Sequence, residues 1–147
     1  MIKKYLFILL AIVCFASCQT SHKIIKTKVP SRPKGQTHVL GLTTPKLDTV
    51  RTEMIGLGMR GISAVERFIH IPGVEIKALC DIRGELCQRA EQTLLKAGKA
   101  KPTSYYGDEQ LWKKVCERDD IDLIYVVTDW ENHANIGVYA TPQGNHV

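Results

Sequence analysis

The stretch Arg51–Gly61, RTEMIGLGMRG, decides the fold that the chain is expected to adopt. It predicts a short strand that breaks into a turn carrying Gly56, Gly58 and Gly61, the glycine spacing of the dinucleotide-binding fingerprint. In that fingerprint the first glycine allows the tight turn, the second lets the backbone approach a pyrophosphate, and the third lets the next helix pack closely on the sheet. The phosphates bind at the N-terminus of that helix, where unpaired amides and the helix dipole attract an anion.

The residues that follow the glycines complete a βαβ unit. An amphipathic run at 62–69 predicts a helix, the pair 72–73 (Pro-Gly) a turn, and 74–79 a second strand. Asp81 then lies where such units place an acid on the adenosine ribose. Two plainer interpretations remain open: a βαβ unit with an ordinary glycine turn and a solvated Asp81, or an Asp81 that only caps the following helix.

The rest of the chain continues to alternate helices and strands. The pattern predicts a helix at 85–97, a strand at 104–106, a helix at 109–117 with Asp108 as N-cap, a strand at 123–127 covered on both faces, a helix at 134–140 and the stub of a fifth strand at 144–147. This alternation indicates an α/β, Rossmann-type doubly wound parallel sheet over residues 50–147, of order 3-2-1-4-5 with the fifth strand cut short.

The N-terminus has the composition of an export signal. Lys3 and Lys4 precede an apolar run at 5–15 that is too short to span a bilayer, and small residues at 16–17 precede Cys18. The ending Phe-Ala-Ser-Cys resembles a bacterial lipobox, although Phe15 replaces the usual aliphatic residue. We therefore expect a lipoprotein-type signal peptide at 1–18 and a membrane lipid attached to Cys18. A plain cleaved signal or an uncleaved anchor is the alternative.

Residues 19–49 are polar, contain three prolines and show no hydrophobic period, so we expect a flexible, disordered tether. Residues 1–49 carry eight Lys or Arg and one Asp, whereas residues 50–147 carry twelve Lys or Arg and fourteen Asp or Glu. The basic charge therefore belongs to the tether, where it suits an anionic membrane surface, and the globular part has no basic face that would suggest nucleic acid. We therefore expect an exported, membrane-anchored lipoprotein that is located in the bacterial periplasm or on the cell surface.

The cysteines do not form a disulfide framework in this interpretation. Cys14 and Cys18 lie in the signal, which leaves Cys80, Cys87 and Cys116. These three show neither a CxxC pair nor a histidine at metal spacing, so no metal site is predicted. We expect buried thiols, with a Cys80–Cys87 bridge as the alternative.

A polar segment follows the strongest predicted strand, at the sheet edge where parallel sheets bind ligands. It contains Asp129, Trp130, Glu131, Asn132 and His133. For each residue a plainer interpretation is open. Trp130 is equally consistent with a packed aromatic residue, Asn132 with an N-cap, His133 with an ordinary residue at a helix start, and the two acids with a solvated loop.

The combination of GLGMRG (56–61), ALCD (78–81), CERDDIDLIYVVTDWENHA (116–134) and GNHV (144–147) resembles the N-terminal domain of the glucose-fructose oxidoreductase and inositol dehydrogenase proteins, the Gfo/Idh/MocA type. The GLGMRG and TDWxxH versions look most like glycoside hydrolase family 109, the NAD-dependent α-N-acetylgalactosaminidases. The resemblance implies that Met59 and Arg60 meet NAD at the phosphate turn, that Asp81 binds the adenosine ribose, and that residues 130–133 flank the nicotinamide side.

The resemblance also implies an activity. Such enzymes hydrolyse terminal N-acetylgalactosamine by transient oxidation of the sugar at C3, elimination and water addition, without the usual pair of carboxylates. Their base and sugar-binding groups lie in a second domain, so no catalytic residue is expected in this chain. An NAD-dependent sugar or polyol oxidoreductase and a non-catalytic truncated remnant are the alternatives, and an oligomer is left open. Glu53 departs from the family pattern, and burying its carboxylate would cost several kcal/mol.

Overall fold

The computed structural model describes residues 43–147 and, before them, residues 26, 28, 31, 34–35 and 40–41. Residues Thr44–Val147 form one compact unit. The expected signal peptide, Cys18 and most of the expected tether lie outside the described residues, so those predictions stay predictions. Within the described part of the chain, no helix is both long and apolar enough to cross a membrane.

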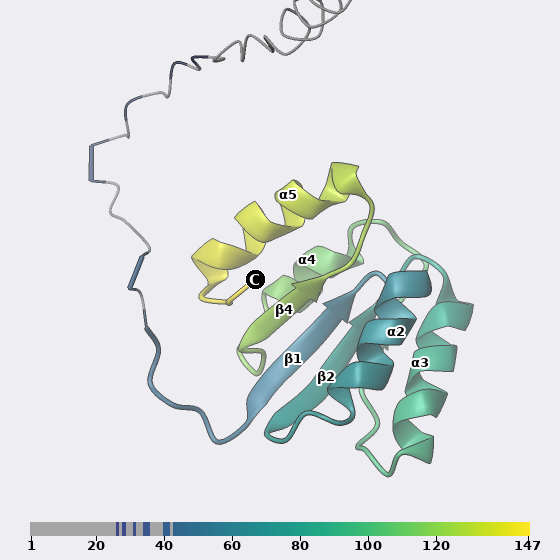
Figure 1. The fold of residues 1–147 in the computed structure, drawn as a ribbon. Coiled ribbons are helices and arrows are strands. Elements are labelled where there is room, and N and C mark those ends of the chain that lie inside the picture. Colours follow the sequence, from purple (N-terminus) through teal and green to yellow (C-terminus); the bar gives the residue numbers. More distant parts are fainter. Residues whose placement is uncertain (1–25, 27, 29–30, 32–33, 36–39, 42) are drawn as a thin grey trace, which may run out of the picture. The chain divides into compact units, whose positions relative to one another are not determined.

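Strands and helices alternate along the compact unit, as predicted (Figure 1). The elements are β1 (Val50–Ile55), α2 (Met59–Phe68), β2 (Val74–Cys80), α3 (Gly84–Lys96), β3 (Thr103–Tyr105), α4 (Leu111–Cys116), β4 (Leu123–Val126), α5 (Trp130–Ala140) and η1 (Thr141–Gln143). The four strands are all parallel, in the order β3-β2-β1-β4. A parallel bridge from Leu123 to His146 adds the stub of a fifth strand beside β4. The predicted α/β class and the order 3-2-1-4-5 are therefore confirmed.

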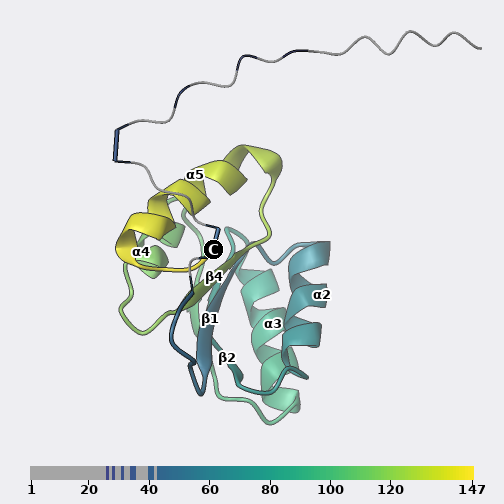
Figure 2. The same cartoon turned by 60° about the vertical axis from the view of Figure 1, so that its left-hand side comes forward.

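Helices cover both faces of the sheet, α2 and α3 on one side and α4 and α5 on the other (Figures 1 and 2). Each face has its own apolar core. The first core gathers Met54, Leu57, Ile62, Ala64, Val65, Ile76, Leu79, Cys87, Ala90 and Leu94. The second gathers Ile55, Ala78, Cys80, Val115, Cys116, Ile121, Ile124, Ile136 and Ala140. β4 is less buried than predicted, because it lies at the edge of the four strands, and only Ile124 of its residues is fully buried.

A bulge at Lys77 sets which side chains of β2 enter each core. Thr52 pairs with Ile76, but the next residue, Glu53, pairs with Ala78, so Lys77 is an extra residue on β2. Ile76 and Leu79 are three positions apart and still share one core, because the extra residue shifts the strict alternation of a strand.

Three helices begin two or more residues away from their predicted starts. α2 begins at Met59 and not at residue 62, because Gly58 itself is the N-cap. α4 begins at Leu111, so its N-cap is Gln110 and the prediction of Asp108 as N-cap is wrong. The Asp108 carboxylate accepts a hydrogen bond from the Gln110 amide at 2.8 Å in the turn that precedes the helix. α5 begins at Trp130 and not at residue 134. Its N-cap is Asp129 and not Asn132, because the Asp129 side chain accepts from the Asn132 amide at 3.0 Å.

The three cysteines of the compact unit are free and buried. Cys80 lies in the core beneath α4 and α5, whereas Cys87 lies in the core beneath α2 and α3, so the alternative of a bridge between them is wrong. Burial raises the pKa of Cys87 to about 11 and that of Cys116 to about 12, which keeps both thiols protonated and unreactive at neutral pH.

Glu53 lies at the centre of the sheet with no exposed surface. It alternates with Met54 on β1, so its side chain enters the core beneath α4 and α5, and neither carboxyl oxygen has a hydrogen-bond partner. Burial raises the pKa of this carboxyl to about 9, and the Arg118 charge opposes the shift only in part. The acid is therefore protonated at neutral pH, and the burial cost anticipated from the sequence is real.

We predict that Glu53→Gln becomes increasingly stabilising as the pH rises. The folded-state pKa of Glu53 lies above its unfolded value, so the folded state binds the extra proton and the wild type loses stability from about pH 4.5 up to about pH 9. The free energy of unfolding of Glu53→Gln, relative to that of the wild type, should grow by roughly 1.4 kcal/mol per pH unit across that window. Urea unfolding between pH 5 and pH 9 measures it, with the exposed Glu66→Gln as control. Parallel stability curves for wild type and Glu53→Gln would contradict a buried, protonated Glu53.

Candidate functional site

Two of the three glycines at the end of β1 are required by the fold. Gly56 has φ +91°, and a Cβ added to it would lie 2.6 Å from the Val127 carbonyl oxygen. A Cβ added to Gly61 would lie 2.0 Å from the Gly56 carbonyl oxygen, so α2 can approach the turn only without a side chain at 61. These two positions make the sharp turn from strand to helix that the fingerprint predicts.

Gly58 has no such structural reason to be glycine. Its φ of −61° is open to any residue, and the nearest atom to an added Cβ is Nη2 of Arg83, at 3.7 Å. Gly58 is also the N-cap of α2, where no side chain caps the helix and no acid lies in the first turn. The space above Gly58 and the uncapped helix end together form a cradle that suits an anion.

Asp81 holds this turn in place from the end of β2. Its Oδ2 accepts a hydrogen bond from the buried Leu57 amide at 2.6 Å, and its Oδ1 accepts from the Arg83 amide at 2.9 Å. The residue is only 8% exposed, so the alternative of a solvated Asp81 is wrong. The side chain acts as more than a helix cap, because it joins the glycine turn to the start of α3.

The cradle opens into a cleft of about 730 Å³ at the carboxyl ends of the strands, a volume suited to a small-molecule ligand. Its walls come from the turn after β1, the end of β2, the segment before α4 and the start of α5. The lining residues are Ile55, Gly56, Gly58, Met59, Arg60, Cys80, Asp81, Ile82, Arg83, Asp108, Glu109, Gln110, Trp112, Val127, Thr128, Asp129, Glu131, Asn132 and Ile136.

Most of the residues predicted from the sequence line this one cleft: Gly56, Gly58, Met59, Arg60, Asp81, Glu131 and Asn132. Three others do not. Gly61 packs against the turn, and Trp130 and His133 lie in the exposed first turn of α5, outside the lining. Trp130 is 89% exposed, so the alternative of a packed aromatic residue is wrong.

Two of the helices that begin at this edge, α2 and α5, differ in the charge at their N-termini. α2 offers an uncapped N-terminus, whereas the N-terminus of α5 is capped by the Asp129 carboxylate and carries Glu131 in its first turn. Carboxylates at a helix start satisfy its amides and repel a further anion. The cleft therefore has an anion-binding end at α2 and an acidic end at α5.

Sequence reasoning missed Arg83 and the segment 108–110, which contribute to the cleft. A signal existed for both. An arginine near the end of the second strand is a known feature of NADP sites, where it meets the 2′-phosphate, and 108–110 follows the third strand at the ligand edge.

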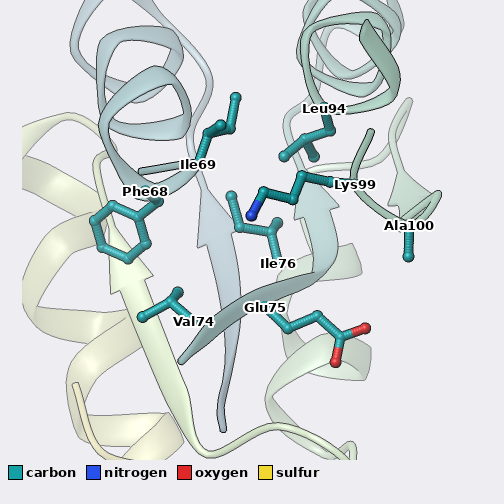
Figure 3. Close-up of a pocket in the computed structure, with 8 residues that line it drawn as sticks. All are labelled: Phe68, Ile69, Val74, Glu75, Ile76, Leu94, Lys99 and Ala100. Atoms are coloured by element: carbon teal, nitrogen blue, oxygen red, sulfur yellow. The ribbon is translucent and has the colours of Figure 1, made fainter. Parts of the chain in front are cut away.

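A second cavity of about 40 Å³ lies at the other edge of the sheet, between the end of α2 and the start of β2 (Figure 3). Its walls are mainly apolar side chains, among them Phe68, Ile76 and Leu94, with the stem of Lys99 beside them. This volume is far below the roughly 300 Å³ of the smallest usual ligand pockets, so the cavity does not suit a nucleotide or sugar.

The chain is similar in sequence to longer bacterial proteins. It is 51% identical to glycosyl hydrolase family 109 protein 1 of Bacteroides thetaiotaomicron, over 99% of this chain and 33% of that protein. It is 48% identical to an alpha-N-acetylgalactosaminidase of Bacteroides fragilis, over 82% of this chain and 27% of that protein. The chain thus spans about a third of the length of these relatives and matches their N-terminal part. No family model matches it.

Solved structures share the fold. The scyllo-inositol dehydrogenase from Lactobacillus casei with bound NAD(H) and scyllo-inositol has a TM-score of 0.56, with 19% identity over 67% of this chain and 27% of that chain. The myo-inositol dehydrogenase from the same organism, in complex with NAD(H) and myo-inositol, has a TM-score of 0.54, with 23% identity over 66% of this chain and 26% of that chain. These likenesses confirm the Rossmann-type architecture.

We predict that Asp81→Ala destabilises the ligand-free chain by about 1–3 kcal/mol, because the buried Leu57 amide loses its acceptor. Asp81→Asn should cost less, since its amide oxygen can still accept one of the two hydrogen bonds. Denaturant unfolding without nucleotide measures both. The control is Asp129→Ala, which removes an exposed carboxylate that also accepts from a backbone amide. A wild-type unfolding midpoint for Asp81→Ala would show that the turn does not depend on this carboxylate.

Proposed function

Because close homologues of this chain are glycosyl hydrolase family 109 proteins, we propose that it is the NAD-binding part of a glycosidase that hydrolyses terminal N-acetylgalactosamine. The substrate class rests on the relative that is named an alpha-N-acetylgalactosaminidase. The cofactor rests on the site, together with the two inositol dehydrogenases whose structures contain NAD(H) and share the fold.

The observation that carries the nucleotide assignment is Gly58. The fold would accept a side chain there, yet the position is glycine, at an uncapped helix end on the floor of the cleft. A pyrophosphate needs this combination, because its oxygens accept hydrogen bonds from backbone amides only where no Cβ stands between them. The residues present therefore fit a dinucleotide.

Each predicted residue has a role in this proposal. Gly58, Met59 and Arg60 hold the pyrophosphate, and Asp81 binds the adenosine ribose, where a carboxylate favours NAD over NADP because it repels a 2′-phosphate. At the acidic end, Glu131 and Asn132 flank the nicotinamide, with Trp130 and His133 beside them at the rim. Bound NAD would supply reversible oxidation at the sugar C3, which makes the C2 proton acidic and lets the glycosidic oxygen leave.

The test of nucleotide binding is Gly58→Ser. Serine is a good N-cap, so we expect thermal stability equal to or above that of the wild type. The added Cβ and Oγ occupy the approach to the α2 amides, so we expect NAD affinity to fall at least tenfold in equilibrium titration. Unchanged NAD affinity in a folded Gly58→Ser chain would remove the pyrophosphate from this turn.

A second candidate is an NAD-dependent sugar or polyol oxidoreductase, favoured by the inositol dehydrogenases that share the fold. The two are separated by an aryl N-acetylgalactosaminide, because only a glycosidase releases the phenol with no net reduction of NAD. For the 147-residue chain by itself we predict neither phenol release nor NADH formation, since it matches only the N-terminal part of its relatives. Phenol release by the chain alone would place catalytic groups among Asp129, Glu131 and His133. A non-catalytic remnant would bind the nucleotide and carry out neither reaction, even as part of a longer protein.

We further propose that residues 1–18 are a lipoprotein signal, that Cys18 carries a membrane lipid, and that residues 19–49 are a tether with no part in the site. An exported protein has no free NAD pool to draw on, which favours a tightly held cofactor regenerated in each turnover. Fractionation of cells that express the chain tests the anchor. Cys18→Ala should move the chain out of the membrane fraction, and an unchanged distribution would exclude lipidation at Cys18.

A further inference from the structure

Arg83 lies between the acid at the end of β2 and the cradle above Gly58. Its Nε is 3.3 Å from Oδ1 of Asp81, and its Nη2 is 3.7 Å from the point that a Cβ on Gly58 would occupy. Its side chain is 56% exposed. Within residues 43–147, neither Nη1 nor Nη2 takes part in a hydrogen bond, so four N–H donors remain for a ligand.

The charged residues that line the cleft indicate which ligand these donors would bind. Among its lining residues the cations are Arg60 and Arg83, whereas the carboxylates are Asp81, Asp108, Glu109, Asp129 and Glu131. A pyrophosphate that enters this cleft carries two negative charges into an acidic surrounding. Backbone amides at α2 and the Arg60 side chain attract it, and a second full positive charge beside Gly58 would offset more of the repulsion from the carboxylates.

We propose that Arg83 binds a phosphate group of the nucleotide above Gly58 and that this group is the pyrophosphate. The inference rests on the proposed function. The planar guanidinium is suited to phosphate oxygens, because its N–H groups form a fixed fork. Asp81 is then a positioning residue as well, since its bond to Nε holds the fork over the glycine.

Arg83 is not required to satisfy Asp81. The two backbone amides of Leu57 and Arg83 already bond the carboxylate, and the side-chain contact is longer, at 3.3 Å, and partly exposed. Exposed ion pairs contribute little to stability. A folded chain without the guanidinium is therefore expected, which separates ligand binding from structure.

The experiment titrates NAD and NADP into the full chain, as wild type, Arg83→Gln, Arg83→Lys and the control Arg89→Gln. Arg89 is an exposed arginine of the same helix α3, outside the cleft lining, so the control removes the same net charge. We expect Arg83→Gln to weaken NAD binding about tenfold or more and to make it less sensitive to salt. Arg83→Lys should recover part of the loss and Arg89→Gln should bind as the wild type does. Thermal unfolding of each variant shows that it is folded.

The two cofactors distinguish the phosphate that Arg83 binds. An equal loss for NAD and NADP assigns the pyrophosphate, and a loss confined to NADP supports phosphate binding by Arg83 but assigns the 2′-phosphate. Unchanged affinity for both in a folded Arg83→Gln chain, with a wild type that binds, overturns this inference and leaves the proposed function standing. A wild-type chain that binds neither nucleotide overturns the proposed function and this inference with it.

Discussion

The Asp81 carboxylate is the constraint on which the candidate site depends. Its two oxygens bond the amide of Leu57, in the glycine turn, and the amide of Arg83, at the start of α3. Leu57 is fully buried, so its amide has no water to replace this acceptor. One side chain thus joins the end of β2 to the loop that leads into α2. Because the acid that we propose to bind the ribose also supports the loop, removing it disturbs the cradle at Gly58, which makes Gly58 the cleaner position for probing the ligand.

The two ends of the cleft differ in charge. α2 begins without a side-chain cap. At the start of α5, in contrast, the Asp129 carboxylate accepts a hydrogen bond from the Asn132 amide. The positive end of one helix is therefore available to phosphate and that of the other is already neutralised. Arg83 adds a cation beside the start of α2, and Glu131 adds an anion at the start of α5. A dinucleotide, with its negative charges on the central pyrophosphate and none at its nicotinamide end, matches this gradient.

Local patterns predicted the fold and seven of the residues that line the cleft. The glycine spacing and the apolar runs were enough for the sheet order, because each depends on residues that are neighbours in sequence. The start of α5 was missed, since the choice of Asp129 and not Asn132 as cap depends on a backbone conformation that composition does not reveal. The Lys77 bulge was missed because it exists only in the pairing of two strands. Arg83 had a signal in its distance from Asp81, but the position of a long side chain over Gly58 follows only from three-dimensional structure.

A pyrophosphate bound at the N-terminus of α2 would change the surroundings of the amides there. An amide NMR titration of the ¹⁵N-labelled chain with NAD detects this change. We expect saturable shifts that are largest at Gly58, Met59, Arg60 and Gly61, whose amides lie at the open helix end, with smaller shifts at Arg83. Saturable shifts confined to the capped start of α5, or no saturable shift at any amide, would contradict pyrophosphate binding at α2.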